Sequence, residues 1–291
     1  MTFRSYAQNS EDVVLWRALK HVSNGCYIDI GANDPIVDSV SLAFYEHGWR
    51  GIHVEPMPDY AAALRAARAD ETVIEAAIAQ TPGKMRLEEF ANSGLTTAKA
   101  DYAEAHRQAG WQSKQIEVPT RTLASLFDDV KATEIHWLKI DVEGMEAEVL
   151  ASWGASALRP WVLAIESTLP NSSQQDWQAW EHFVTDREYR FAYFDGLNRF
   201  YVHKSRAELL SGFGPGPSSQ ITRPLPDVGN SVGAPARTAK VAAKNVLRLF
   251  AGFALAIARR FPALKRLIWA LVSPFPSLRL KLAQWVRSLT K

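Results

Sequence analysis

Cysteine is almost absent from this chain. Its 291 residues include one, Cys26, so an internal disulfide and a thiolate-ligated metal cluster are both excluded. A lone cysteine at the start of a predicted strand is typical of a small buried hydrophobic residue. The N-terminus also lacks the apolar stretch of a secretory signal. Both features predict a protein of a reducing, cytoplasmic compartment.

Acidic residues are missing after Asp227. Of the 33 Lys and Arg residues, 12 follow Asp227, which leaves 21 against 31 acidic residues in the first 227 positions. The net charge of +2 therefore combines an acidic body with a basic tail, and such a difference indicates different partners. A stretch rich in Gly, Pro and Ser separates the two. We predict a domain at 1–210, a flexible linker at 211–236 and a helical tail at 237–291.

The tail has no apolar run long enough to span a bilayer. Its longest uncharged apolar run, residues 249–258, has 10 residues, whereas a span needs roughly 20. Lys240, Lys244 and Arg248 recur on one helical face, with large apolar residues on another. This pattern predicts attachment to an anionic membrane surface, on the inner face of the cell membrane. Packing on the body or on a second subunit is the alternative, and nucleic acid is disfavoured because large aliphatic residues separate the cations.

In the body, short apolar runs alternate with helical patterns. The predicted strands are residues 25–30, 51–55, 72–78, 135–141 and 161–166. Helical patterns lie at residues 9–18, 39–46, 60–69, 122–128, 146–151 and 177–185. This alternation predicts an α/β fold with a mostly parallel sheet covered on both faces. Residues 189–194 and 199–202 flank a four-residue turn, which predicts a closing β-hairpin.

The turn after the first predicted strand begins with a glycine but lacks the G-x-G-x-x-G pattern of dinucleotide-binding proteins. Gly31 is followed by Ala32, Asn33, Asp34 and Pro35. Ligands of parallel sheets bind at the carboxyl ends of the strands, and a glycine permits a tight turn and close approach there. We therefore predict a ligand site at this turn, without the glycine-lined surface that a pyrophosphate needs.

An acid also ends the next predicted strand. Glu55 follows Gly31 by 24 residues, and the two oxygens of its carboxylate can accept from both hydroxyls of a ribose. A nicotinamide cofactor would use a similar acid, but S-adenosylmethionine carries no phosphate and fits this turn better. An NAD(P)-dependent oxidoreductase stays the alternative, although the chain also lacks a Tyr-x-x-x-Lys pair.

Five stretches of the chain together resemble the FkbM family of methyltransferases. They read SYAQNSED (5–12), YIDIGAN (27–33), GWRGIHVEP (48–56), VPTRTL (118–123) and HWLKIDVEG (136–144). The resemblance extends over roughly residues 5–203. It implies a Rossmann-like class I methyltransferase fold with a seven-stranded sheet, and transfer of a methyl group to oxygen, often on sugars or polyketides.

The same resemblance implies a set of cofactor-binding residues. Asp29 would border the methionine end of S-adenosylmethionine, Glu55 would hold the ribose, and Ala77 and Ile78 would lie near the adenine. The N-terminal segment that includes Gln8 would form a lid. The full predicted set is Gln8, Asp29, Gly31, Ala32, Asn33, Glu55, Pro56, Ala77 and Ile78.

Methyl transfer to a hydroxyl needs a positioned acceptor and a group that takes its proton. Asp141 and Glu143 follow the fourth predicted strand and Glu166 ends the fifth, so we predict these three as the catalytic acids. Lys139 points to the same side of its strand as Asp141, which favours an ion pair. Asp141, Glu166 and Asn171 would also suit Mg²⁺, and a base that works without a metal is the alternative.

These features predict an S-adenosylmethionine-dependent O-methyltransferase. The expected acceptor is a hydroxyl of a sugar, a glycan or a lipid-linked saccharide. Besides the oxidoreductase, a non-catalytic glycan-binding module on the same fold stays open. The sequence does not specify which hydroxyl receives the methyl group.

Overall fold

The computed structural model describes residues 3–90, 96–108, 110–169, 172 and 174–214. The chain divides into two units, Met1–Pro226 and Asp227–Lys291, and every described residue belongs to the first. The predicted tail at 237–291, most of the predicted linker and Asn171 therefore lie outside the described residues.

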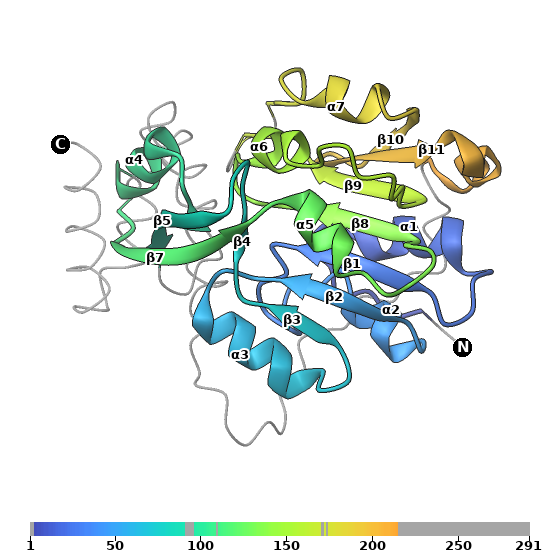
Figure 1. Ribbon diagram of the computed structural model, residues 1–291, viewed down its shortest axis with the longest axis horizontal. Coiled ribbons are helices and arrows are strands. Elements are labelled where there is room, and N and C mark those ends of the chain that lie inside the picture. Colours follow the sequence, from blue (N-terminus) through green and yellow to red (C-terminus); the bar gives the residue numbers. More distant parts are fainter. Residues whose placement is uncertain (1–2, 91–95, 109, 170–171, 173, 215–291) are drawn as a thin grey trace, which may run out of the picture. The chain divides into compact units, whose positions relative to one another are not determined.

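The main sheet has seven strands in the order β10, β11, β9, β8, β1, β2 and β3 (Figure 1). Their bounds are Cys26–Ile30 (β1), Arg50–Val54 (β2), Thr72–Ile74 (β3), Trp137–Ile140 (β8), Val162–Glu166 (β9), Tyr189–Phe194 (β10) and Asn198–His203 (β11). Five neighbouring strands of this sheet pair in parallel: β9, β8, β1, β2 and β3. Strand β11 runs antiparallel to both β9 and β10. The sheet is mixed, and the predicted α/β class and closing hairpin are confirmed.

Helices cover both faces of this sheet. They are α1 (Glu11–Leu19), α2 (Leu42–Glu46), α3 (Pro58–Ala67), α5 (Leu123–Asp128), α6 (Glu146–Ala151), α7 (Glu181–Thr185) and the 3₁₀ helix η1 (Lys204–Gly212). One core cluster joins the sheet to α5, α6 and α7, and another joins it to α1, α2 and η1. In β1, Ile28 belongs to the first cluster and Tyr27 to the second, because successive strand residues face opposite sides.

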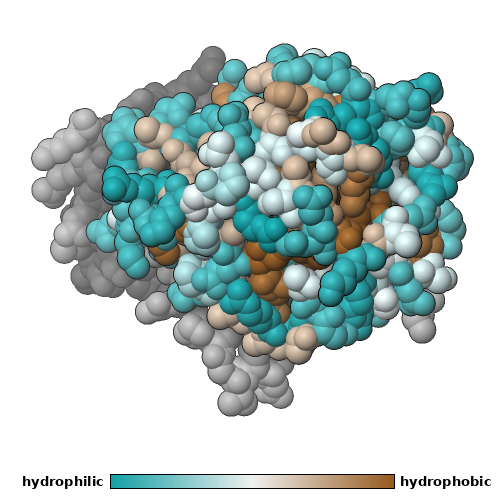
Figure 2. All heavy atoms as spheres, viewed as in Figure 1, coloured by the Kyte–Doolittle hydropathy of each residue, from teal (hydrophilic) through white to brown (hydrophobic). Residues whose placement is uncertain are grey.

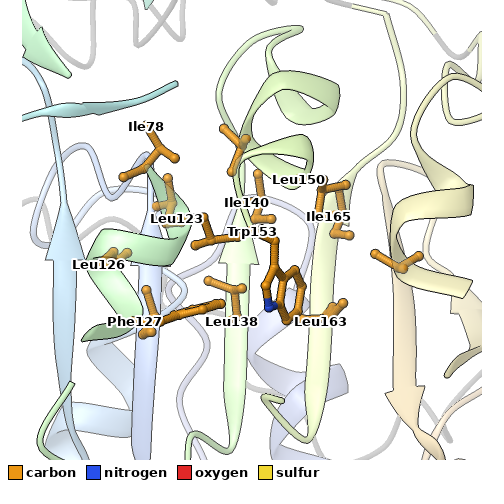
Figure 3. Close-up of a cluster of buried hydrophobic side chains, with 14 of the residues drawn as sticks. Ile78, Leu123, Leu126, Phe127, Leu138, Ile140, Leu150, Trp153, Leu163 and Ile165 are labelled. Carbon is orange, nitrogen blue, oxygen red and sulfur yellow. The ribbon is translucent and has the colours of Figure 1, made fainter. Parts of the chain in front are cut away.

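The first cluster explains why the sequences of the central strands consist almost entirely of apolar residues. Leu138 and Ile140 of β8 and Leu163 of β9 belong to one cluster with the apolar side chains of α5 and with Trp153 (Figure 3). Strands that are buried on both faces need apolar residues at almost every position. In β8, Lys139 is the exception, and it lies at the functional site described below.

A second sheet was not predicted from the sequence. It has the order β4, β7, β5 and β6, and its strands are Ala77–Ile78 (β4), Gly83–Phe90 (β5), Thr96–Thr97 (β6) and Ser113–Arg121 (β7). Helix α4 (Ala100–Gln108) lies between β6 and β7 in the chain. The prediction of one strand at 72–78 is wrong, because the Ala76 N–H donates to the Ile74 carbonyl in a tight turn. The chain thereby leaves β2 and pairs with β7.

The surface of the described residues is mixed in character. Figure 2 shows hydrophobic residues in central patches of this face, surrounded by hydrophilic ones. Ile36 and Val37 are 57% and 53% exposed, which is unusual for large hydrophobic residues of this domain. Within the described residues, no helix combines the length and apolar character that crossing a membrane requires.

Candidate active site

A cavity of about 230 Å³ lies at the carboxyl ends of β1, β2 and β8. Every residue predicted to bind the cofactor lines it: Gln8, Asp29, Gly31, Ala32, Asn33, Glu55, Pro56, Ala77 and Ile78. Asp141 and Glu143, two of the three predicted catalytic acids, line it as well, whereas Glu166 does not. The fold therefore brings together residues from five separate segments of the chain.

The turn after β1 is as tight as its glycine suggests. Gly31 has φ +78°, and a Cβ atom there would lie 1.8 Å from the Asp141 carbonyl oxygen. The N–H groups of Gly31 and Ala32 both donate to the Val54 carbonyl, at 2.9 and 3.3 Å. Any other residue at position 31 would force β1 and β8 apart, because two backbones meet there without room for a side chain.

Glu55 sits directly after β2 and is held by the backbone. Its Oε2 accepts from the Asn33 N–H and its Oε1 from the Met57 N–H, both at 2.8 Å. Burial raises the pKa of Glu55 to about 7, although these two amides favour the charged form. A carboxylate has about four acceptor sites, so two of them stay available to a ligand.

Asp29 is the acid of β1 and is 2% exposed. Its Oδ2 lies 4.0 Å from His53 Nδ1, and its Oδ1 has no hydrogen-bond partner among the described residues. A buried carboxylate oxygen without a partner is costly, and it suits a ligand that donates hydrogen bonds. His53 itself is a core residue, because its Nε2 lies 2.8 Å from buried Glu71 and it does not line the cavity.

At the end of β8, Lys139 and Asp141 form the predicted ion pair. The Lys139 ammonium donates to Asp141 Oδ2 at 2.6 Å. Burial alone would lower the pKa of Lys139, but the Asp141 and Asp29 carboxylates hold this pKa above its ordinary value. Lys139 is therefore charged in the cavity and keeps the Asp141 carboxylate in place.

Three more acids lie behind this pair. Burial raises the pKa of Glu143 to about 8 and that of Glu146 to about 7, and nearby Asp141 adds to both shifts. Burial and then Asp141 raise the pKa of Glu166 well above its usual range. Like charges in a dry environment disfavour ionisation, and of these three acids Glu143 lines the cavity, with a pKa close to neutral pH.

The N-terminal segment forms one wall of the cavity through Gln8 and Glu11. Glu11 Oε2 accepts from the Asn9 N–H at 2.9 Å, and its Oε1 accepts from Asn198 Nδ2 at 3.1 Å. Burial raises the pKa of Glu11 to about 7. The contact with Asn198 joins this segment to the hairpin of β10 and β11.

The charge of the lining is strongly one-sided. Among the lining residues one is basic, Lys139, and six are acidic: Glu11, Asp29, Asp38, Glu55, Asp141 and Glu143. A cavity lined by one sign of charge attracts ligands of the opposite sign. It is therefore suited to a cationic ligand and poorly suited to a pyrophosphate.

Of the wall that comes from the second sheet, sequence reasoning predicted Ala77 and Ile78 of β4 but missed the residues of β5 and β6. Met85 and Leu87 of β5 and Thr96 of β6 line the cavity, together with Ala98. A signal for β5 does exist, because Met85 and Leu87 alternate with charged residues in the manner of a half-buried strand. For β6, two residues long, the sequence holds no comparable pattern.

The predicted magnesium site finds no support. Asn171 lies outside the described residues, and among those that are described no group of three or more His, Cys, Asp or Glu residues is placed to hold a metal ion. Asp141 is engaged by the Lys139 ammonium, which supplies the positive charge that a metal would bring.

The fold and this cavity are those of a Rossmann-like α/β protein with a ligand site at the carboxyl edge of its sheet. The sequence pattern of the methyltransferase FkbM domain matches residues 29–191, which is more than half of the chain. The chain therefore belongs to the FkbM methyltransferase family, as the motifs predicted. It is a methyltransferase, and the oxidoreductase alternative is set aside.

Two solved structures are similar to this chain. An O-methyltransferase from Bacillus cereus in complex with SAH is 12% identical, with 66% of this chain and 81% of that chain covered and a TM-score of 0.35. A putative O-methyltransferase from Klebsiella pneumoniae is 11% identical, with 68% and 82% covered and a TM-score of 0.34. Both likenesses are weak in sequence and in superposition. No curated protein sequence matches the chain.

Proposed function

We propose that the chain is an S-adenosylmethionine-dependent O-methyltransferase and that this cavity binds the cofactor. The observation that carries the proposal is the lining itself, with six acids around one lysine and Glu55 anchored at the end of β2. S-adenosylmethionine is a sulfonium cation without phosphate groups, and it supplies a methyl group that an acceptor oxygen can attack.

The residues present fit this cofactor. The two acceptor sites of Glu55 that the backbone leaves available suit a ribose diol. Asp29 Oδ1, which lacks a partner among the described residues, suits the ammonium of the methionine end. The apolar side chains of Ile78 and Met57 offer a surface for the adenine.

The β8 end of the cavity is proposed to supply the base that takes the proton of the acceptor hydroxyl. We assign Glu143 as the general base, because it lines the cavity and its pKa of about 8 is close to neutral pH. Its carboxylate would take the proton that the acceptor hydroxyl loses on methylation, while the electron pair of the broken methyl–sulfur bond would stay on the sulfur of the leaving thioether. Asp141, fixed by Lys139, orients the acceptor hydroxyl.

The proposed acceptor is a hydroxyl of a sugar, a glycan or a lipid-linked saccharide. Support comes from the resemblance to a family that often methylates sugars and from the basic tail, which would bring the domain to a membrane. The test is transfer of a labelled methyl group from S-adenosylmethionine into cell-envelope glycan fractions. Label in the saccharide supports the proposal, and cofactor binding without transfer to any such fraction favours the non-catalytic glycan-binding module instead.

The tail at 237–291 is proposed to attach the chain to an anionic membrane surface. Support comes from the sequence pattern, in which Lys240, Lys244 and Arg248 recur opposite an apolar face. The full chain should float with vesicles that contain phosphatidylglycerol. A variant with these three residues changed to Glu should float much less, and equal flotation of both proteins would reject the anchor.

A further inference from the structure

The cavity wall between β1 and α2 is a loop with little regular structure. Residues 31–41 contain no helix or strand apart from a single bridge between Asp38 and Ala7. Val37, Asp38 and Val40 of this loop line the cavity. Its path therefore depends on contacts from outside the loop.

Besides the Asn33–Glu55 hydrogen bond and the bridge to Ala7, one buried side chain, Arg68 at the end of α3, supplies such contacts. Arg68 is 1% exposed, and its Nη2 donates to the Pro35 carbonyl at 2.7 Å and to Ser39 Oγ at 2.9 Å. Its Nη1 donates to Ser41 Oγ at 2.8 Å. A single planar guanidinium thus holds three points along the loop, which a flexible point charge cannot do.

The guanidinium is itself fixed by a buried acid, Glu71, which lies directly before β3 and contacts residues of β1 and β2. Arg68 Nη1 lies 3.7 Å from Glu71 Oε2. Glu71 Oε1 accepts from the Tyr27 hydroxyl of β1 at 2.6 Å and from the Gly51 N–H of β2 at 2.7 Å, and His53 Nε2 lies 2.8 Å from its Oε2. The loop is therefore connected, through Arg68 and Glu71, to β1, which carries Asp29, and to β2, which Glu55 follows.

We propose that Arg68 is a positioning residue of the cofactor site, which holds loop 33–41 at a fixed distance from the acids of β1 and β2. It does not line the cavity and touches no reacting atom. The proposal rests on the proposed function for its ligand. Groups that orient a binding site from behind it typically matter about as much as those that contact the ligand.

The test is a titration of S-adenosylmethionine into the full-length Arg68→Lys protein. Lysine keeps the charge but cannot reach all three loop acceptors, so the Kd should rise by about 10-fold or more. The kcat at saturating cofactor should stay within about 3-fold of the wild type, because the chemistry takes place at β8. The matched control is Arg199→Lys, whose arginine is also buried and paired with Glu181, away from the cavity, and it should leave the Kd unchanged.

Hydrogen exchange of the ligand-free protein gives a second, independent readout. In Arg68→Lys the amides of residues 36–41 should exchange faster than in the wild type, while those of β8 and β9 should not change. Where Arg68→Lys does not fold, Ser39→Ala and Ser41→Ala remove single acceptors and should show the same pattern to a smaller degree. If folded variants show an unchanged Kd and unchanged hydrogen exchange in the loop, the role of Arg68 is overturned. If the wild type does not bind S-adenosylmethionine, the proposed function is overturned, and the hydrogen-exchange result still tests whether Arg68 holds the loop.

Discussion

The two ends of the cavity hold their acids in different ways. At the β1–β2 end, Glu55 accepts from two backbone amides, and the neighbouring buried network contains the cation Arg68. At the β8 end, the Lys139 ammonium holds Asp141, and burial together with nearby Asp141 raises the pKa of Glu143 to about 8. Amide donors fix the carboxylate at one end, whereas a lysine fixes it at the other.

From the way Glu55 is anchored, we infer that one end binds the cofactor and the other carries the chemistry. A rigid carboxylate with free lone pairs recognises hydroxyls, and its geometry matters more than its proton. Burial raises the pKa of Glu55 to about 7 and that of Glu143 to about 8, so the two ends differ in how their carboxylates are held and not in whether they can exchange a proton. Variants at the two ends should therefore affect different kinetic quantities.

The largest expected effect is at the binding end. Glu55→Ala removes two hydrogen bonds from a charged group to the ribose, each worth about 1.5–3 kcal/mol, so the Kd of S-adenosylmethionine should rise by about 100-fold or more. Calorimetric titration measures it. Glu148→Ala is the control, since that glutamate pairs with Lys99 and does not line the cavity. Equal affinity of Glu55→Ala and the wild type would remove the distinction between the two ends.

At the chemical end, Glu143→Gln should lower kcat by about 100-fold, the usual contribution of a general base. The Kd of the cofactor should stay within about 3-fold, because the amide has nearly the same shape. Asp141→Asn should also lose turnover while it keeps binding. A large loss of affinity with normal kcat in either variant would mean that this end binds the cofactor too.

The pH dependence of turnover sharpens the assignment of the base. Glu143 has a pKa of about 8 and works only when ionised, so kcat should rise with pH up to about 8 and then level off. The Glu143→Gln protein should lack this rise. A flat profile in the wild type between pH 6 and 9 would rule out Glu143 as the base.

Stability should change with pH in the direction opposite to that of most acidic proteins. Glu11, Glu55, Glu143 and Glu146 have pKa values raised by burial from 4.5 to about 7 or 8. The folded state therefore binds more protons than the unfolded state, and this stabilisation is full below 4.5 and lost as pH rises through 7 to 8. Scanning calorimetry should show a Tm lower at pH 8.5 than at pH 6 by roughly 3 °C or more, and a higher Tm at pH 8.5 would contradict these shifts.

The smallest effect is expected at Glu166. It ends β9 and does not line the cavity, and glutamine keeps an N–H that can donate to Asp141 in place of the protonated carboxyl, so Glu166→Gln should change kcat and Kd by less than about 3-fold. Steady-state kinetics and calorimetry measure both quantities. A loss of turnover as large as that of Glu143→Gln would place Glu166 in the chemistry, as the sequence predicted.

The strand-end acids could be predicted because each follows a buried apolar run. Asp29, Glu55 and Asp141 stand where parallel strands end, and parallel strands share one carboxyl edge. The apolar run before each acid and the shared carboxyl edge of parallel strands were sufficient to predict that these three residues lie at one site. The same reasoning placed Glu166 at this edge but could not show that it lies outside the cavity.

The rest of the site depends on contacts between distant parts of the chain. Pro35 has no N–H, and the position of its carbonyl is set by Arg68, 33 residues later, which no local pattern reveals. The turn at Ala76 that sends the chain from β3 to β4 is similarly hidden, because residues 72–78 read as one continuous strand. Tertiary contacts override local propensity at both places.

The most direct test of the central claim is a calorimetric titration of the wild-type chain with S-adenosylmethionine at neutral pH, with NAD and NADP titrated in parallel. The cavity is acidic and lacks the glycine-lined surface that a pyrophosphate needs. It therefore predicts saturable binding of S-adenosylmethionine at one site per chain and no binding of either dinucleotide. Folded protein that binds NAD or NADP, or that fails to bind S-adenosylmethionine, would contradict it.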